Sequence, residues 1–160
     1  MFRIFAIIIT AFATVSSASA QEQFEKWLVY SQPGRILAFT VPRRGEMLAL
    51  LCEEKCKYLV SLNIGCEEGA IMPFIVNDSK AEAVSVDLTC HVSGGRTFFY
   101  LDDFDVTKLM RGNMIAFGWP SDDELISVSR FSLSGAKEAT ASAMALWKKA
   151  AAPVAPSAAK

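Results

Sequence analysis

The chain has 160 residues, of which 52% are hydrophobic and 21% are charged, and its formal net charge at pH 7 is −1. This length suits one domain, and the apolar fraction excludes disorder over the whole chain. The near-neutral charge excludes the strongly basic field of most nucleic-acid-binding proteins, so we predict no nucleic-acid partner. A single histidine leaves little room for histidine-based catalysis or a histidine-rich metal site.

Residues 1–20 contain the three parts of a secretory signal peptide: Arg3, an apolar run, and small residues at Ala18 and Ala20. We therefore predict cleavage before Gln21 and export to the periplasm. The alternative is an uncleaved anchor, because the uncharged stretch is near the lower limit of about 17–25 residues for a membrane span. No later segment is long and apolar enough to span a bilayer, so we expect no membrane association after cleavage.

The mature part contains four cysteines: Cys52, Cys56, Cys66 and Cys90. An even number in an exported chain indicates two disulfides, with three possible connectivities. A zinc site usually needs two close pairs of ligands, and His91 is the only imidazole available. The sequence therefore predicts disulfides and no metal site.

Alternating residues favour one connectivity. The pattern over 56–64 places Cys56 on the apolar face of a strand, and the pattern over 84–90 does the same for Cys90. If residues 53–55 form a tight turn, Cys52 and Cys56 face each other across a hairpin, within disulfide range. We favour Cys52–Cys56 together with Cys66–Cys90, and the other pairings stay open.

Strand-like runs recur along the chain, with turn signals between them. Short strands at this spacing predict a mainly β fold, either a β-sandwich or a strongly bent antiparallel sheet. The predicted strands are Trp27–Tyr30, Ile36–Val41, Met47–Cys52, Cys56–Ile64, Ile71–Val76, Ala83–Val92, Arg96–Leu101, Met114–Trp119 and Leu125–Leu133.

Two helices are expected in the second half. Residues 106–112 follow acidic residues and end on a glycine, which favours a short helix. Ser134 can cap a C-terminal helix whose alanines and Trp147 recur at helical spacing, and this helix should pack on the sheet. We expect one domain over residues 21–149 and a disordered Ala/Pro tail over residues 150–160.

Few residues suggest a catalytic or metal-binding role. His91 should point outward at a strand end, as a surface or rim histidine. The acidic clusters could bind calcium, but helix capping and turn solvation explain them better. Paired carboxylates for glycoside hydrolysis stay open, because their separation is not encoded locally. The clusters are Asp102, Asp103 and Asp105, and Asp122, Asp123 and Glu124.

The remaining motifs have structural explanations. The Ser93-Gly94-Gly95 run predicts a hairpin turn, because it lacks the lysine of a phosphate loop and precedes a strand. Arg43 and Arg44, with Arg35 nearby, form a small basic region on a turn, typical of solubility but able to contact an anionic partner. Trp27, Trp119 and Trp147 are expected in the core or at its rim.

The second half resembles a known family. Residues 102–113 precede a strand, a Pro-Ser-Asp-Asp turn, the segment 126–136 and an alanine-rich helix. This order resembles the invasion-associated locus B family of small exported bacterial proteins over residues 96–147, and its ending is similar to an accessory protein of type VI secretion. The resemblance implies a periplasmic, non-enzymatic protein linked to host interaction, with no catalytic residues. The first half departs from the family, because Trp27 is not closely followed by a cysteine.

We therefore expect a periplasmic, non-catalytic binding or accessory protein with a protein partner, and neither an enzyme nor a cofactor-binding protein. One alternative is a hydrolase that pairs Asp102, Asp103 or Asp105 with another carboxylate. A second alternative is a small-ligand carrier, which would need a closed apolar pocket.

Overall fold

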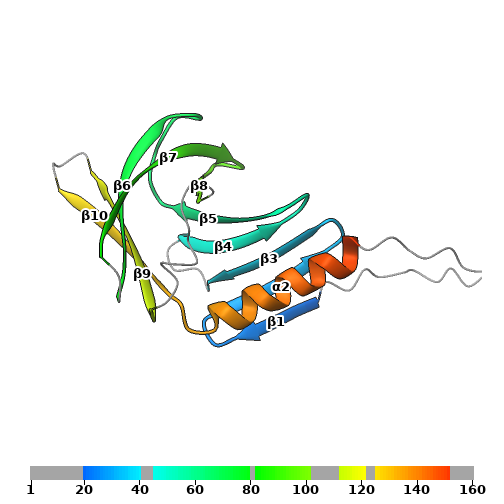
Figure 1. Ribbon diagram of the computed structural model, residues 1–160. Helices are drawn as coiled ribbons and strands as arrows, with labels where there is room; N and C mark the ends of the chain where they lie inside the picture. Colours follow the sequence, from blue (N-terminus) through cyan, green and yellow to red (C-terminus); the bar gives the residue numbers. More distant parts are fainter. Residues whose placement is uncertain (1–19, 41–44, 80–81, 102–111, 122–124, 152–160) are drawn as a thin grey trace, which may run out of the picture.

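The computed structural model describes residues 20–40, 45–79, 82–101, 112–121 and 125–151. In this part of the chain ten strands form one antiparallel sheet in the order β1-β2-β3-β4-β5-β8-β7-β6-β9-β10, with one helix, α2 (Figure 1). The predicted fold class, mainly β with a C-terminal helix, is confirmed. Nearly all of the predicted short helix over 106–112 lies outside the described residues. The elements are β1 (Ala20–Phe24), β2 (Trp27–Gln32), β3 (Arg35–Thr40), β4 (Met47–Cys52), β5 (Cys56–Leu62), β6 (Ile71–Asp78), β7 (Val84–Ser93), β8 (Arg96–Tyr100), β9 (Met114–Pro120), β10 (Ile126–Ser132) and α2 (Ala136–Ala151).

The sheet bends so that its two halves face each other, and β7 pairs with strands of both halves. Residues 84–89 of β7 pair with β6, whereas residues 90–93 pair with β8. Strands β6, β9 and β10 therefore lie across from β2–β5, as Figure 1 shows. Strands that change neighbours in this way make the corners of sandwich-like folds.

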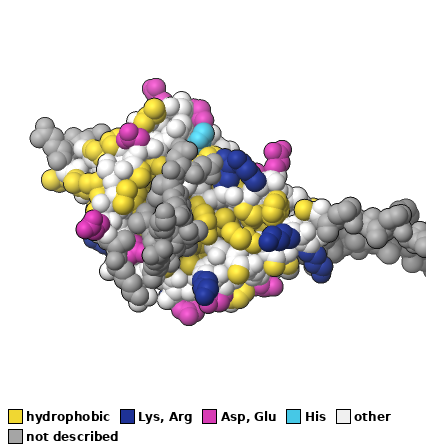
Figure 2. Space-filling model, in the orientation of Figure 1, with side chains coloured by type: hydrophobic (Ala, Val, Ile, Leu, Met, Phe, Trp, Pro, Cys, Tyr) yellow, Lys and Arg dark blue, Asp and Glu magenta, His cyan; other side chains and the backbone are white. Residues whose placement is uncertain are grey.

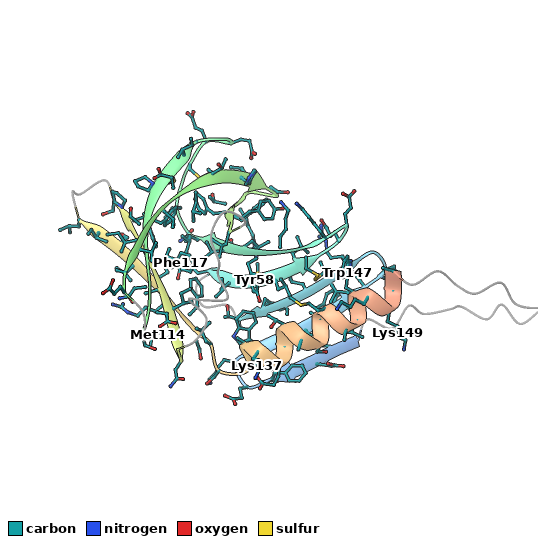
Figure 3. The ribbon with its side chains drawn as sticks, viewed as in Figure 1. Tyr58, Met114, Phe117, Lys137, Trp147 and Lys149 are labelled. Carbon is teal, nitrogen blue, oxygen red and sulfur yellow. A yellow bond between two sulfur atoms is a disulfide. The ribbon has the colours of Figure 1, made fainter. Side chains whose placement is uncertain are left out.

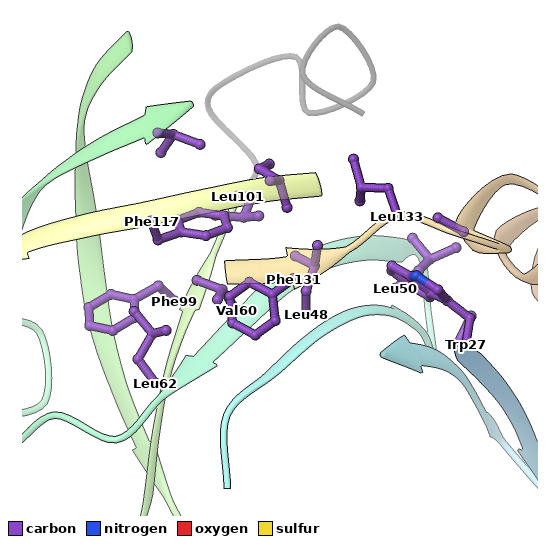
Figure 4. Packing of buried hydrophobic residues seen from close by; sticks show 14 of the residues in the cluster. Trp27, Leu48, Leu50, Val60, Leu62, Phe99, Leu101, Phe117, Phe131 and Leu133 are labelled. Atoms are coloured by element: carbon purple, nitrogen blue, oxygen red, sulfur yellow. The ribbon is translucent and has the colours of Figure 1, made fainter. Parts of the chain in front are cut away.

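Both halves of the sheet contribute to one core. Phe74 of β6 packs edge-on against Phe99 of β8, and Phe117 of β9 packs against Phe131 of β10, with ring centroids 4.9 and 5.9 Å apart. Figure 4 shows Val60 of β5 among the rings of Phe99, Phe117 and Phe131. In the second half of β7 the predicted apolar face is the buried one, at Leu88 and Cys90, whereas β5 is buried on both faces from Leu59 to Leu62.

Helix α2 covers the same inner face, beside β1–β4. Its small residues make this close approach possible, and Ala139 and Ala143 are buried. The first helical hydrogen bond runs from the Ala139 N–H to the Gly135 carbonyl, so Gly135 takes the position predicted for Ser134. Gly135 has φ +82°, and a β-carbon there would overlap the carbonyl oxygen of Phe24. Only glycine satisfies both conditions.

Three contacts fasten the connector between β10 and α2 to the first hairpin. The Trp27 indole N–H donates to the Ser132 carbonyl over 2.9 Å, and the Lys26 N–H donates to the Ser134 carbonyl over 3.3 Å. Gly135 supplies the third contact, against Phe24. Trp27 is fully buried, as expected for a core tryptophan. These contacts hold the β1–β2 turn against the segment that leads from β10 into α2.

The ends of the fold differ slightly from expectation. Strand β1 was not predicted, because its residues between Ala20 and Phe24 are polar and do not alternate. Helix α2 ends at Ala151, two residues into the predicted tail, and residues 152–160 lie outside the described chain. In the described part, no helix is long and apolar enough to cross a membrane.

Both disulfides pair as the alternation favoured. Cys52 and Cys56 face each other in the β4–β5 ladder, with Cα atoms 3.9 Å apart. Cys66 is bonded to Cys90 with Cα atoms 6.4 Å apart, and Cys90 is the residue at which β7 changes neighbours. The second disulfide therefore fixes the corner of the fold.

Candidate binding surface

His91 lies on β7, next to the corner disulfide, and its side chain is 33% exposed. Its Nδ1 lies 3.0 Å from Oε1 of Glu68, and the ring stacks beside Phe98 with centroids 5.6 Å apart. His91 therefore lies partly exposed at the rim of the sheet, as predicted. A thiol–imidazole pair is not formed, because Cys90 is bonded to Cys66.

The loop that contains Cys66 also positions Glu68. The Gly69 N–H donates to the Cys90 carbonyl, and the Cys90 N–H donates to the Ala70 carbonyl, so this loop runs beside β7. The Val92 N–H donates to Oε2 of Glu68. This backbone hydrogen bond, more than the contact with His91, lowers the pKa of Glu68. Glu68 is therefore a carboxylate at neutral pH.

We expect a titration of Glu68, followed by the carboxyl carbon shift in NMR, to have a midpoint below the ordinary value for glutamate. Because the folded pKa is lowered, this interaction stabilises the fold above the unfolded pKa and is lost as the pH falls through the folded pKa. In His91→Ala most of the lowering should persist, since Val92 is its main cause. A midpoint that returns to the ordinary value in His91→Ala would contradict this assignment.

An aromatic cluster surrounds His91 on the outer face of the sheet. Phe98 and Tyr100 of β8 pack edge-on with centroids 5.5 Å apart, and Tyr100 also contacts the His91 ring at 5.2 Å. Nζ of Lys57 lies 4.6 Å from the centroid of Tyr100. The rings of β7 and β8 and the Lys57 ammonium group of β5 contact one another, so their main effect is to stabilise the pairing of these strands.

A hollow with a volume of about 790 Å³ lies between the C-terminal end of α2 and the β2–β3 hairpin. Trp147 lines it and donates from its indole N–H to the Glu53 carbonyl over 2.7 Å. In Figure 3 Trp147 is directed toward the strands and Lys149 away from them. Arg35, the described member of the predicted basic region, pairs with the Glu53 carboxylate. The hollow is open to solvent, unlike the closed pocket of a carrier.

Tyr58 of β5 packs against the core and interacts with Thr140 of α2. Burial raises the pKa of Tyr58, and a hydrogen bond with Thr140 partly offsets the increase. The tyrosine therefore stays neutral at physiological pH and serves as a packing residue with one satisfied polar group.

Several predicted candidates cannot be placed. Arg43, Arg44 and both acidic clusters, 102–105 and 122–124, lie outside the described residues. The Ser93-Gly94-Gly95 run is placed, and it forms the predicted turn between β7 and β8. Among the described residues, no group of three or more His, Cys, Asp or Glu could hold a metal ion.

The outer face of β6, β9 and β10 exposes large apolar side chains side by side. Ile75 of β6 and Val128 of β10 are 46% and 43% exposed, and both are paired with Gly118 of β9. Ile71 and Ile126 extend the surface, with 71% and 62% of their area exposed. A hollow of about 210 Å³ lies on this surface, lined by Ile75, Gly118 and Ile126 among others. Figure 2 shows hydrophobic side chains over β6 and β10.

Sequence reasoning missed this apolar surface, although the pattern contained a signal. In β10 the buried positions are Ser129 and Phe131, while Ile126 and Val128 lie on the opposite face. The residues that share a face with buried Phe131 are the serines at 127 and 129. Ile126 and Val128 therefore lie on the face opposite to the core. Large apolar residues out of phase with the buried face of a strand indicate an exposed patch.

A crystal structure of invasion associated protein B from Bartonella henselae has a similar fold. Its TM-score with this chain is 0.60 at 14% sequence identity, and the match covers 81% of this chain and 99% of that chain. No protein-family model and no curated protein matches the sequence. The predicted resemblance to type VI secretion accessory proteins stays a prediction. The similarity predicted from residues 96–147 thus extends, at the level of the fold, over most of the chain, which is similar in fold to an invasion associated protein B.

Proposed function

We propose that the chain is a periplasmic, non-catalytic accessory protein that binds a protein partner, with residues 1–20 removed as a signal peptide. The observation that carries this proposal is the exposed apolar surface on β6, β9 and β10. Monomeric soluble proteins rarely expose contiguous large apolar side chains without an interaction that covers them. The two disulfides fit an oxidising compartment.

The comparison adds a biological setting to the proposal. The protein of similar fold is described as invasion associated. A role for this chain in contact between a bacterium and its host is therefore part of the proposal. The partner would dock on the apolar surface, where Ile75, Gly118 and Val128 are neighbours.

The test is photo-crosslinking in the native cell, with the photoreactive residue placed at position 75. Position 144 is the matched control, because Met144 is also an exposed apolar residue but lies on α2. We expect a discrete adduct from position 75 and none from position 144. Mass spectrometry of the periplasmic fraction should find a chain that begins at Gln21.

Two results would overturn the proposal. Equal adducts from positions 75 and 144 would mean that the apolar surface has no specific partner. A chain that keeps residues 1–20 and stays in the membrane fraction would contradict the predicted cleavage and location.

A further inference from the structure

Strand β10 forms one edge of the sheet, and its ladder shows which backbone groups are free. The Ser121 N–H donates to the Leu125 carbonyl, and the Leu133 N–H donates to the Asn113 carbonyl. In this register the odd-numbered residues of β10 hydrogen-bond with β9. The even-numbered residues therefore direct their N–H and C=O groups away from β9.

One of these outward groups already has a partner. The Ser132 carbonyl accepts the hydrogen bond from the Trp27 indole. No described residue hydrogen-bonds to the outward backbone groups of Ile126, Val128 or Arg130. Within the described part of the chain, three consecutive even positions thus present unpaired donors and acceptors along one line.

The space beside this edge is open at its Arg130 end. A hollow of about 600 Å³ is lined there by Arg130 and Ser132 of β10 and by Thr40 and Glu46, and Glu46 accepts a hydrogen bond from the Ser129 hydroxyl on the inner face. An extended segment therefore has room beside the Arg130 end of β10. The opposite edge of the sheet differs, because β1 carries Gln21, Glu22 and Gln23, and polar or charged residues discourage edge pairing.

The side chains beside the free edge of β10 indicate which residues an added peptide strand would need. Ile126 and Val128 point to the outer face and are exposed, and Arg130 follows on the same face. Arg130 forms no ion pair with any described residue. In an antiparallel pair, residues directly opposite each other share a face and interact. The added strand then needs an acidic residue opposite Arg130 and apolar residues opposite Val128 and Ile126.

We infer that β10 binds an extended peptide strand with an acidic residue followed by apolar residues two and four positions later. Backbone hydrogen bonds to Ile126, Val128 and Arg130 supply affinity, and the alternate side chains supply selectivity. The ion pair with Arg130 sets the register. This inference rests on the proposed function, because the strand is a segment of the protein partner.

The test uses the exported protein and a synthetic peptide, acetyl-Ser-Glu-Thr-Val-Thr-Ile-Ser-amide, followed by amide NMR. We expect the largest shifts and slowed hydrogen exchange at the amides of Ile126, Val128 and Arg130. The amides of Ser127 and Ser129, which face β9, should change less. A peptide with Gln in place of Glu should bind about two- to fivefold more weakly, and this difference should vanish in Arg130→Gln.

Val128→Pro is the decisive variant, because it removes one outward N–H at an edge position where proline is tolerated. Val128→Thr is the matched control, since threonine is β-branched and keeps the N–H. We expect Val128→Pro to weaken peptide binding about tenfold or more. Val128→Thr should stay within about threefold. Unchanged circular dichroism of both variants will show that the fold is intact.

Three outcomes would overturn the inference. Equal binding to Val128→Pro and Val128→Thr would exclude backbone pairing at this edge. Shifts confined to the hollow beside Trp147 would place the peptide elsewhere. Concentration-dependent dimerisation of the protein that Val128→Pro abolishes would identify a second copy as the occupant. If an adduct from position 75 persists in any of these cases, the proposed function stands while the strand-addition inference fails.

Discussion

Replacing Cys66 and Cys90 together by alanine is expected to lower the free energy of unfolding by about 3–4 kcal/mol. This disulfide joins residues 24 positions apart, so it removes more entropy from the unfolded chain than a short bridge does. It also fixes the corner at which β7 passes from β6 to β8. Urea unfolding followed by tryptophan fluorescence measures the loss.

The matched control is the double replacement of Cys52 and Cys56. Their separation is four positions, for which the same chain-entropy argument gives about 2 kcal/mol. The two variants should therefore differ in a fixed order, with the corner disulfide contributing more. Equal losses, or a larger loss for the hairpin disulfide, would show that loop closure does not dominate the stabilisation.

Replacing Gly135 by alanine is expected to lower the free energy of unfolding by about 3 kcal/mol. A residue with φ +82° is strained when it has a side chain, and the added methyl group overlaps the Phe24 carbonyl. Relieving the overlap would move the connector away from Trp27, whose indole is bonded to Ser132. Thermal and urea unfolding measure the change.

The variant Gly34→Ala separates the cost of the positive φ from the cost of the overlap with Phe24. Gly34 has a similar φ of +78°, but a β-carbon there would meet nothing within 4 Å. This variant should therefore lose only about 1 kcal/mol, from the backbone conformation alone. An equal loss in both variants would mean that the contact with Phe24 adds nothing at Gly135.

Much of the fold was predictable because its strands carry local signals. Residues 56–64 and 84–90 alternate, and from their phase alone Cys56 and Cys90 were assigned to apolar faces. That phase favoured the pairing of Cys52 with Cys56, because opposed sulfur atoms meet on the same face, and this pairing leaves Cys66 as the partner of Cys90, as the structure shows. In contrast, β1 has no local signal and pairs because β2 offers it a free edge.

The candidate surfaces were less predictable, because exposure depends on what packs above each face. The pattern in β10 separates Ile126 and Val128 from Phe131, but it does not tell which face is covered. Glu68 could not be associated with His91 from sequence either. Their approach depends on the Cys66–Cys90 bond and on the loop that it holds beside β7.

The sequence by itself predicted the positions of strands β2–β10, the C-terminal helix and the favoured pairing of the cysteines. These features depend on periodicity and spacing, which act over a few residues. Only the tertiary structure decided that β7 serves both halves of the sheet, that Gly135 lies against Phe24, and that β10 keeps a free edge beside an apolar face. Each of these depends on segments far apart in the chain, and chain folding brings them together only when the common core forms.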